Sequence, residues 1–378
     1  MIQQRNRVAH VSSAHPWTDN RVHLREAVSL HDAGYDVVLI AVESSEKAQL
    51  SSVKVKLIPR RTRLRRLTIS SLQAVFLAVR SQASVVHLHD PELIWAIPVL
   101  RTLGRKVIFD AHEDLPSQIM DKHYLPKPLR SAVARAAGIL TLVASSSDHV
   151  IAATETIARR FPAAKTTVVK NYPRLRQQDA DLPNLDDRPL HVVYVGAISD
   201  TRGAQVMAAA VDDNAFPSDW KLSLAGHFVP ASTADLFSNV LHVERTEVHG
   251  KVSPAEARDL LVQARVGLVV LQDTVAYRDS LPTKMFEYMA AGLPVIASDF
   301  PLWRSILEPL DCATFVDETS SEAVAIAVSA YANDLELLHR HGENAKRAAL
   351  AELNWTSQEK TLLAVYELLV SVPTVQKK

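Results

Sequence analysis

The sequence predicts an α/β protein made of two doubly wound domains, each a parallel sheet with helices on both faces. Short, nearly continuous apolar runs alternate with helical patterns, which is typical of parallel strands that are covered on both sides. The alternation starts again after residue 190, and 378 residues exceed the size at which one core usually keeps growing. Ligands of such sheets bind outside the carboxyl ends of the strands, so two similar halves predict a cleft between them.

Each half contributes its own series of strands. Helices are predicted at 21–33, where Gly34 ends the helix, at about 65–80, and after Asp90, which is a candidate cap. The polar, proline-containing stretch 174–190 is the expected linker, so we expect domains at 1–173 and 191–356. The predicted strands are 7–11, 36–42, 53–58, 85–89, 106–110, 149–153 and 166–171, then 191–196, 221–226, 266–271, 294–298 and 313–316.

Composition excludes several classes of protein. Lys plus Arg equals Asp plus Glu at 42 each, whereas domains that bind nucleic acid are usually clearly basic. The single cysteine, Cys312, rules out a disulfide framework or a cysteine-rich metal site and suits a reducing cytoplasm. The first residues lack the apolar core of a signal peptide, and no apolar run reaches the roughly 18 residues that span a bilayer. We therefore expect a cytoplasmic protein, at most attached to the inner face of the membrane.

The most informative segment is 279–300, where a helix follows Pro282 and ends before a buried strand. Thr283 and Lys284 lie at the start of this helix, beside free backbone amides and at the positive end of the helix dipole. A diphosphate is the anion that this arrangement suggests. Glu287, one turn further along, is placed to accept hydrogen bonds from sugar hydroxyls. The alternative is a plain amphipathic helix whose apolar residues pack in the core.

The segment DSLPTKMFEYMAAGLPVIASDF resembles the donor-site motif of glycosyltransferase family 4, the large retaining family with the GT-B fold. That motif carries two acidic residues eight positions apart, which correspond here to Asp279 and Glu287. The resemblance implies that Glu287 holds the ribose hydroxyls and that Asp279, usually Glu in the family, faces the donor sugar. The segment PTKMFEYMAAGLPVIASDFPLW is especially similar to the corresponding sequence of family members that build bacterial surface polysaccharides.

The opening of the second domain, VGAISDTRG at 195–203, resembles the family's strand–glycine–loop–basic–glycine segment. This implies that Gly196 approaches the donor closely and that Arg202 neutralises its diphosphate. A second basic residue that the family often has is replaced by Ala197, so Lys284 or Arg21 would compensate. The alternative for Arg202 is a solvated loop residue. The stretch VHGKVSP (248–254) resembles the loop that cradles the nucleobase.

In the first domain, VIFDAHED (107–114) resembles the family segment with a catalytic-site histidine, which falls on His112. The implied role is positioning of the donor sugar, and the alternative is a structural histidine. The loop 12–26 lacks the usual glycine pair but resembles a subgroup pattern through Asp19, Arg21 and the pair Arg25–Glu26. Arg21 would then meet the diphosphate or an acidic acceptor. The alternative is that Asp19 caps a helix and that the pair lies on the surface.

A basic stretch, PRRTRLRRL (59–67), leads into an amphipathic helix. The apolar residues expected on one face of this helix are Leu64, Leu67, Leu72, Val75, Phe76 and Val79. Basic residues beside such a helix fit an anionic membrane or a lipid diphosphate, so residues 60–80 are a candidate for peripheral membrane contact. The alternative is a core helix packed on its own sheet. The family resemblance implies a saccharide or lipid-linked acceptor near this domain.

Together these features predict a retaining glycosyltransferase of the hexosyltransferase type, moving a sugar from a nucleoside diphosphate to a hydroxyl acceptor in surface polysaccharide or glycolipid synthesis. The resemblance implies no cofactor and no bound metal, and a C-terminal helix at about 357–378 that packs back onto the first domain. The sequence likewise offers no cluster with metal-ligand spacing. Two alternatives stay open: a sugar-nucleotide epimerase of the same fold, and a non-catalytic sugar-nucleotide-binding protein. A nicotinamide dehydrogenase is disfavoured because SSAHPWTDNR lacks the glycine fingerprint.

Overall fold

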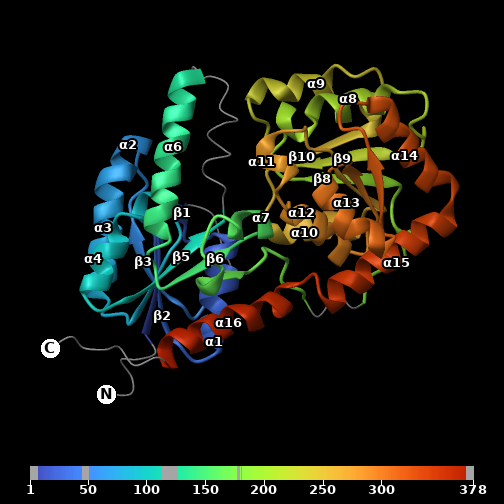
Figure 1. The fold of residues 1–378 in the computed structure, drawn as a ribbon. Coiled ribbons are helices and arrows are strands. Elements are labelled where there is room, and N and C mark those ends of the chain that lie inside the picture. The colour runs from blue at the N-terminus through green and yellow to red at the C-terminus, as the bar shows by residue number, and fades with distance from the viewer. Residues whose placement is uncertain (1–6, 45–50, 113–126, 177–178, 180, 372–378) are drawn as a thin grey trace. The chain divides into compact units, whose positions relative to one another are not determined.

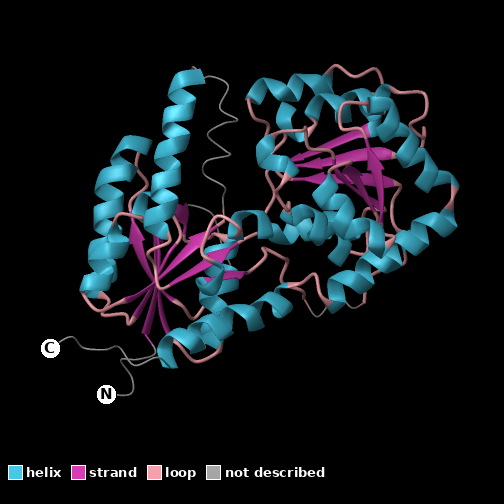
Figure 2. Ribbon diagram, in the orientation of Figure 1, coloured by secondary structure: helices cyan, strands magenta, loops and turns pink. Residues whose placement is uncertain are grey.

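The computed structural model describes residues 7–44, 51–112, 127–176, 179 and 181–371 (Figure 1). The chain forms two compact units, one made of residues 1–171 and 355–378 and the other of residues 172–354. Both are parallel sheets flanked by helices, so the predicted α/β class with two doubly wound sheets is confirmed (Figure 2). Among the described residues, no helix has the length and apolar character needed to cross a membrane.

The first unit has a seven-stranded sheet in the order β3-β2-β1-β4-β5-β6-β7, and all neighbouring strands are parallel. Helices and helical turns alternate with the strands along the chain. The strands are β1 (Arg7–Pro16), β2 (Asp36–Val42), β3 (Lys54–Ile58), β4 (Val85–Leu88), β5 (Lys106–Ala111), β6 (His149–Ala152) and β7 (Thr166–Val168). The helices are a π-helix (Asn20–Ala27), α1 (Val28–Asp32), α2 (Arg63–Arg65), a π-helical turn (Arg66–Ser70), α3 (Ser71–Arg80), α4 (Ala96–Thr102), α6 (Lys127–Ala144), α7 (Glu155–Ala158) and α16 (Trp355–Ser371).

Both faces of this sheet are covered by apolar side chains, as its nearly continuous apolar strands predict. One core packs alternate strand residues such as Ala9 and Val11 against α3 and α4. The core on the opposite face contains Val8 and Leu39 together with apolar side chains of α16, including Trp355. The last helix of the chain is therefore part of the first unit, although the whole second unit separates it from that unit in sequence.

The second unit has a six-stranded parallel sheet in the order β10-β9-β8-β11-β12-β13. One large core packs its strands against the surrounding helices. The strands are β8 (His191–Val195), β9 (Lys221–Ala225), β10 (Thr246–Gly250), β11 (Val266–Val269), β12 (Val295–Ser298) and β13 (Ala313–Val316). The helices are α8 (Ala204–Asp212), α9 (Ala234–Ser238), α10 (Pro254–Val262), α11 (Val275–Arg278), α12 (Thr283–Ala290), α13 (Pro301–Leu307), α14 (Ser321–Asn333) and α15 (Leu335–Ala351).

The structure differs from the sequence expectations in three elements. Residues 246–250 form the edge strand β10, whereas 248–254 was expected to be the nucleobase loop. The helix expected at 21–33 begins as a π-helix and continues as the short α1. The segment 174–190, expected as a linker, belongs to the second unit, where the buried guanidinium of Arg188 donates hydrogen bonds to the carbonyls of Pro183 and Ala291.

Candidate functional site

The strand order locates one candidate binding edge in each unit. In the first sheet the chain runs outward from β1 to β3 and then, from β4 on, in the opposite direction. In the second sheet the same reversal falls between β8 and β11. Ligands of doubly wound sheets bind at the carboxyl ends of the strands beside such a reversal. The residues that follow β1, β4, β8 and β11 are therefore the candidates for ligand binding.

Directly after β8, Gly196 has a backbone conformation (φ +131°) that side chains rarely adopt. A Cβ atom at this position would lie 3.1 Å from the Nζ atom of Lys284, so a glycine is what lets this lysine approach the strand end. Gly226, after the neighbouring β9, is equally constrained, because its Cβ would lie 1.8 Å from the carbonyl oxygen of Gly196. The loop thus brings bare backbone and an ammonium group together at the carboxyl edge of the sheet.

Lys284 is the second residue of α12, and its ammonium nitrogen is buried. Within the described part of the chain this nitrogen has no hydrogen-bond partner, and it lies 3.7 Å from the centroid of the Tyr194 ring. Burial lowers the pKa of Lys284 well below its ordinary value, the nearby positive charge of Arg202 lowers it further, and Glu287 opposes both. A buried cation without an acceptor is costly, so an anion binding here would gain its full charge interaction.

Arg202 ends a short 3-10 turn, Asp200–Arg202, in the loop after β8. Its Nε atom donates a hydrogen bond of 3.4 Å to the hydroxyl of Tyr277. Gly203 follows with a left-handed backbone (φ +80°), and a Cβ there would lie 2.2 Å from the carbonyl oxygen of Val270 at the end of β11. The two strands on either side of the reversal are thus held close, with Arg202 supplied by the loop after β8 and Lys284 by the start of α12. Ala197 contributes no charge, as the sequence already indicated.

The other residues predicted for this site surround the start of α12. Thr283 is its first residue, as expected, and Pro282 precedes the helix in an extended conformation. Glu287 lies one turn after Lys284 and is half-buried, and its backbone carbonyl accepts a hydrogen bond from Arg258. Asp279 follows α11 and is exposed. Three apolar residues of α12 pack in the core, namely Met285, Phe286 and Met289. Both the donor-site hypothesis and the alternative of a plain amphipathic helix require this packing.

In the first unit, a buried carboxylate organises the carboxyl ends of β1 and β4. Asp90 does not cap the turn that follows it, contrary to the expectation. It instead accepts hydrogen bonds from the hydroxyl of Ser12, the backbone amides of Ser13 and Ala14, and forms a 2.8 Å ion pair with His15. This carboxylate therefore fixes the loop after β1.

The His15–Asp90 pair strongly shifts the pKa of both groups. Burial by itself would lower the pKa of His15, but the hydrogen bond and charge of Asp90 outweigh it and raise this pKa to about 9. Burial would raise the pKa of Asp90, yet His15 and the serine donors lower it to about 2. At neutral pH the pair is therefore a full ion pair. Sequence reasoning missed His15; the available signal was its place in the loop after the first strand.

His112, the predicted sugar-positioning histidine, lies just after β5. Its Nδ1 atom is 3.5 Å from an oxygen of Asp110, and its ring centroid is 5.0 Å from that of His15. The side chain is 19% exposed, so part of the ring is accessible from outside the unit. The acidic residues that follow it, 113 and 114, fall outside the described residues. Two histidines thus meet at this strand edge, where sequence reasoning expected one.

Arg21 differs from the prediction that it meets a diphosphate. Its guanidinium donates two hydrogen bonds to Asp110, of 3.0 and 2.8 Å, and a third to the carbonyl of Val169, and only 6% of the side chain is exposed. The group is an internal ion pair rather than an open anion site. The side chain of Asp19 caps the π-helix, as the alternative hypothesis for this loop predicted. Arg25 and Glu26 are buried, so the expected surface pair is wrong.

Two family models match the chain. The model of glycosyltransferase family 4 matches residues 20–171, and that of glycosyl transferases group 1 matches residues 176–348. The chain belongs to glycosyltransferase family 4. It is therefore a glycosyltransferase that takes its sugar from a nucleotide sugar. No curated sequence matches the chain significantly.

Solved structures of this enzyme class share the fold at low sequence identity. Sucrose-phosphate synthase from Thermosynechococcus elongatus is 18% identical, with a TM-score of 0.73 over 96% of this chain and 99% of that one. Anabaena HepE in complex with UDP-glucose is 13% identical, with a TM-score of 0.71 over 97% and 100%. WaaG, a glycosyltransferase involved in lipopolysaccharide biosynthesis, is also 13% identical, with a TM-score of 0.69 over 95% and 99%. The likeness confirms the GT-B fold of this glycosyltransferase.

Proposed function

We propose that this enzyme transfers a hexose from a nucleoside-diphosphate sugar to a hydroxyl acceptor and retains the anomeric configuration. The observation that carries the proposal is the ammonium of Lys284, which is buried at the end of β8 beside Gly196 and Arg202 and has no hydrogen-bond partner within the described chain. A diphosphate supplies the negative charge that this arrangement lacks. The retaining outcome follows from membership of the family.

The chemical difficulty is the departure of the diphosphate while an oxocarbenium-like sugar forms. Positive groups fixed in place before the reaction stabilise the charge that develops on the leaving group. Arg202, Lys284 and the first amides of α12 take this role in the proposal. Glu287 holds the ribose hydroxyls, and Asp279 and His112 orient the donor sugar. The acceptor hydroxyl attacks on the face from which the phosphate leaves and gives its proton to the departing diphosphate oxygen, so no covalent glycosyl-enzyme forms.

Thermal stabilisation by nucleotides tests the donor site. UDP, GDP, dTDP and ADP, with CMP as a monophosphate, are each added to the wild type, to Lys284→Ala and to Lys221→Ala. Lys221 begins β9, so it lies at the amino ends of the strands, away from the proposed site at their carboxyl ends. It also pairs with Glu247, which makes it a matched control. A ligand at about 100 times its dissociation constant adds roughly 2.7 kcal/mol to the free energy of unfolding.

The expected result is that one diphosphate raises the melting temperature of the wild type and of Lys221→Ala but not that of Lys284→Ala. Screening sugar conjugates of that nucleotide for transfer to an acceptor then tests turnover. A response that survives in Lys284→Ala would remove the donor diphosphate from this position. Sugar interconversion without an acceptor would favour the epimerase instead.

We further propose that the acceptor is saccharide or lipid-linked and that residues 60–80 contact an anionic membrane. Four apolar side chains predicted for this helix are exposed, namely Leu64 at 78%, Leu67 at 44%, Leu72 at 59% and Phe76 at 56%. Val75 instead packs in the core, so only part of the predicted face is covered by the sheet. Exposed arginines lie beside this surface, at positions 60, 63 and 65. An apolar face with a basic margin matches an anionic lipid surface.

Co-sedimentation with liposomes tests the membrane contact. Wild type should bind vesicles that contain anionic lipid at low salt, and binding should fall with added salt because charge attraction contributes. The variant Leu72→Gln/Phe76→Gln should lose most of the binding. Leu241→Gln, which changes an 83% exposed leucine of the second unit, is the matched control. Equal retention of all three proteins, or of none, contradicts the proposal.

A further inference from the structure

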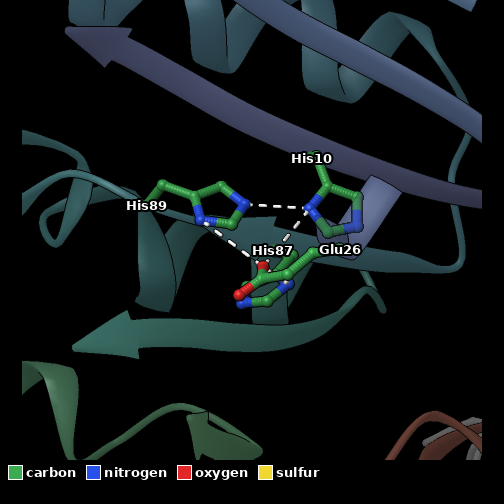
Figure 3. A group of neighbouring side chains, drawn as sticks. All are labelled: His10, Glu26, His87 and His89. Atoms are coloured by element: carbon green, nitrogen blue, oxygen red, sulfur yellow. Dashed lines mark hydrogen bonds and ion pairs between the residues drawn. The ribbon is translucent and has the colours of Figure 1, made fainter. Parts of the chain in front are cut away.

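Four buried side chains that are far apart in the sequence meet inside the first unit. His10 lies on β1, Glu26 on the π-helix, His87 on β4, and His89 directly after β4 (Figure 3). One nitrogen or oxygen atom from each lies within 4.8 Å of the others, and all four residues are fully buried. Three histidines and a carboxylate form a typical ligand set for a transition-metal dication.

The distances are close to those of a coordination sphere. One oxygen of Glu26 is 4.0 Å from His10 Nδ1, 3.8 Å from His87 Nδ1 and 3.9 Å from His89 Nδ1. His10 Nδ1 and His89 Nε2 are 2.9 Å apart. Ligands of a tetrahedral zinc ion, at metal distances of about 2.0–2.1 Å, lie about 3.3 Å from each other. Because the four ligand atoms lie within 4.8 Å of one another, the side chains would have to move closer by up to about 1.5 Å to bind one ion.

Two buried carboxylates lie beside the histidines. Arg21 Nε is 3.2 Å from Glu26, and the same guanidinium donates two hydrogen bonds to Asp110. Neither oxygen of Glu26 has a hydrogen-bond partner within the described chain. The oxygen of Glu26 that faces the histidines is therefore available to a metal ion.

The surroundings of the histidines favour a metal. Histidines that bind metals usually have their second ring nitrogen hydrogen-bonded to a carboxylate, carbonyl or other polar group. His89 Nδ1 is 3.1 Å from an oxygen of Asp110, and the hydroxyl of Tyr366 is 2.8 Å from His87 Nδ1 and 3.4 Å from His10 Nε2. His87 Nε2 is buried and has no partner in the described part of the chain. His10 Nδ1 and His89 Nε2, which face each other at 2.9 Å, therefore remain for the ion, and His87 keeps one nitrogen without a partner in the described part of the chain.

We propose that His10, Glu26, His87 and His89 form a closed structural site for a divalent transition metal, with zinc as the first candidate. The ligands are imidazole and carboxylate, which suit zinc, and full burial leaves no open position for a substrate. The ion would tie β1, the π-helix and β4 together and, through Tyr366, α16 as well. This departs from the expectation that the chain has no metal cluster, because neither the spacing 10, 26, 87, 89 nor any short motif predicts the meeting of these residues.

Metal content of the intact chain tests the proposal. The protein is produced without a histidine tag in zinc-supplemented medium, desalted, and analysed by plasma mass spectrometry beside Glu26→Gln and His242→Gln. His242 lies in the second unit and is 41% exposed, so its loss should not matter. We expect about one zinc per chain in wild type and His242→Gln, and less than about a fifth of that in Glu26→Gln, because coordination to metal needs the carboxylate.

X-ray absorption at the zinc edge of the wild type gives a second measurement that does not depend on the folding of a variant. It should show only nitrogen and oxygen neighbours, at about 2.0–2.1 Å. Wild-type protein without zinc would overturn the proposal. Zinc retained equally by Glu26→Gln, or sulfur among the neighbours, would also overturn it, because the ion would then lie elsewhere.

Discussion

At the scale of single residues, the first unit carries an ion pair whose energy depends on pH. His15 and Asp90 attract each other at 2.8 Å with Asp90 fully buried, and the pKa of His15 is raised to about 9. A histidine with a raised pKa stabilises the fold completely below its ordinary pKa of about 6.5, and this stabilisation is lost as the pH rises through the folded value. The pKa of Asp90, lowered to about 2, limits the same pair only in strong acid.

We therefore expect His15→Gln to lower the free energy of unfolding by about 2 kcal/mol at pH 6 and by much less at pH 10. Urea unfolding of wild type and variant at the two pH values measures this. His242→Gln, which changes an exposed histidine, should show no such dependence. A loss of the same size at both pH values would mean that the imidazole contributes packing rather than charge.

Site residues were predictable where a local sequence feature marks the start of an element. The cluster Thr283, Lys284 and Glu287 follows Pro282, so the start of α12 can be read directly from the sequence. Arg21 could not be assigned in this way, because its partner Asp110 is 89 positions away and only the folded sheet brings the two together. Long-range pairing of this kind leaves no local pattern.

At the scale of elements, strands with continuous apolar runs were predicted well and irregular elements were not. The strand 36–42 and the strand 313–316 have the predicted bounds. The edge strand β10 has the sequence TEVHG and is largely accessible, so it has no apolar run to reveal it. The π-helix depends on a hydrogen-bond register that residue periodicity does not encode, since its apolar residues fit an ordinary helix equally well.

The contact between the loop after β8 and the end of β11 predicts a sensitive glycine. Gly203→Ala should destabilise the second unit by more than about 2 kcal/mol, because its Cβ would lie 2.2 Å from a backbone oxygen of Val270. Gly250 also has a positive φ, but a Cβ there would meet nothing within 4 Å. Gly250→Ala should therefore cost only about 1 kcal/mol. Chemical unfolding compares the two variants. Equal losses would show that the contact is relieved at no cost.

At the scale of the whole molecule, the two units were predictable from the restart of the strand pattern, but the point of division was not. The polar residues of 174–190 indicate a linker, yet the units divide at Asn171 and Tyr172, and Leu185 and Arg188 of that segment are buried. Composition reports average exposure, whereas these two side chains depend on specific partners. The return of the last helix to the first unit was implied only by the family resemblance.

Two buried tryptophans distinguish the units. Trp355 of α16 packs in the first unit and donates a hydrogen bond to Ser29, while Trp303 packs in the second unit and donates one to the carbonyl of Ser280. Each change to alanine should cost about 3–5 kcal/mol. Hydrogen exchange with mass spectrometry should show lost protection in β1–β7 for Trp355→Ala and in β8–β13 for Trp303→Ala. Loss across both sheets in either variant would contradict separate cores in the two units.

The most direct measurement of diphosphate binding against Lys284 is calorimetry of the stabilising nucleoside diphosphate at pH 9, in two buffers with different heats of ionisation. An ordinary lysine is already charged at this pH, but burial beside Arg202 lowers the pKa of Lys284. If the diphosphate binds against Lys284, binding takes up a proton and the measured enthalpy differs between buffers. The difference should vanish in Lys284→Met and persist in Lys221→Met. Equal proton uptake by the wild type and Lys284→Met would place the diphosphate away from Lys284 and contradict the proposed donor site.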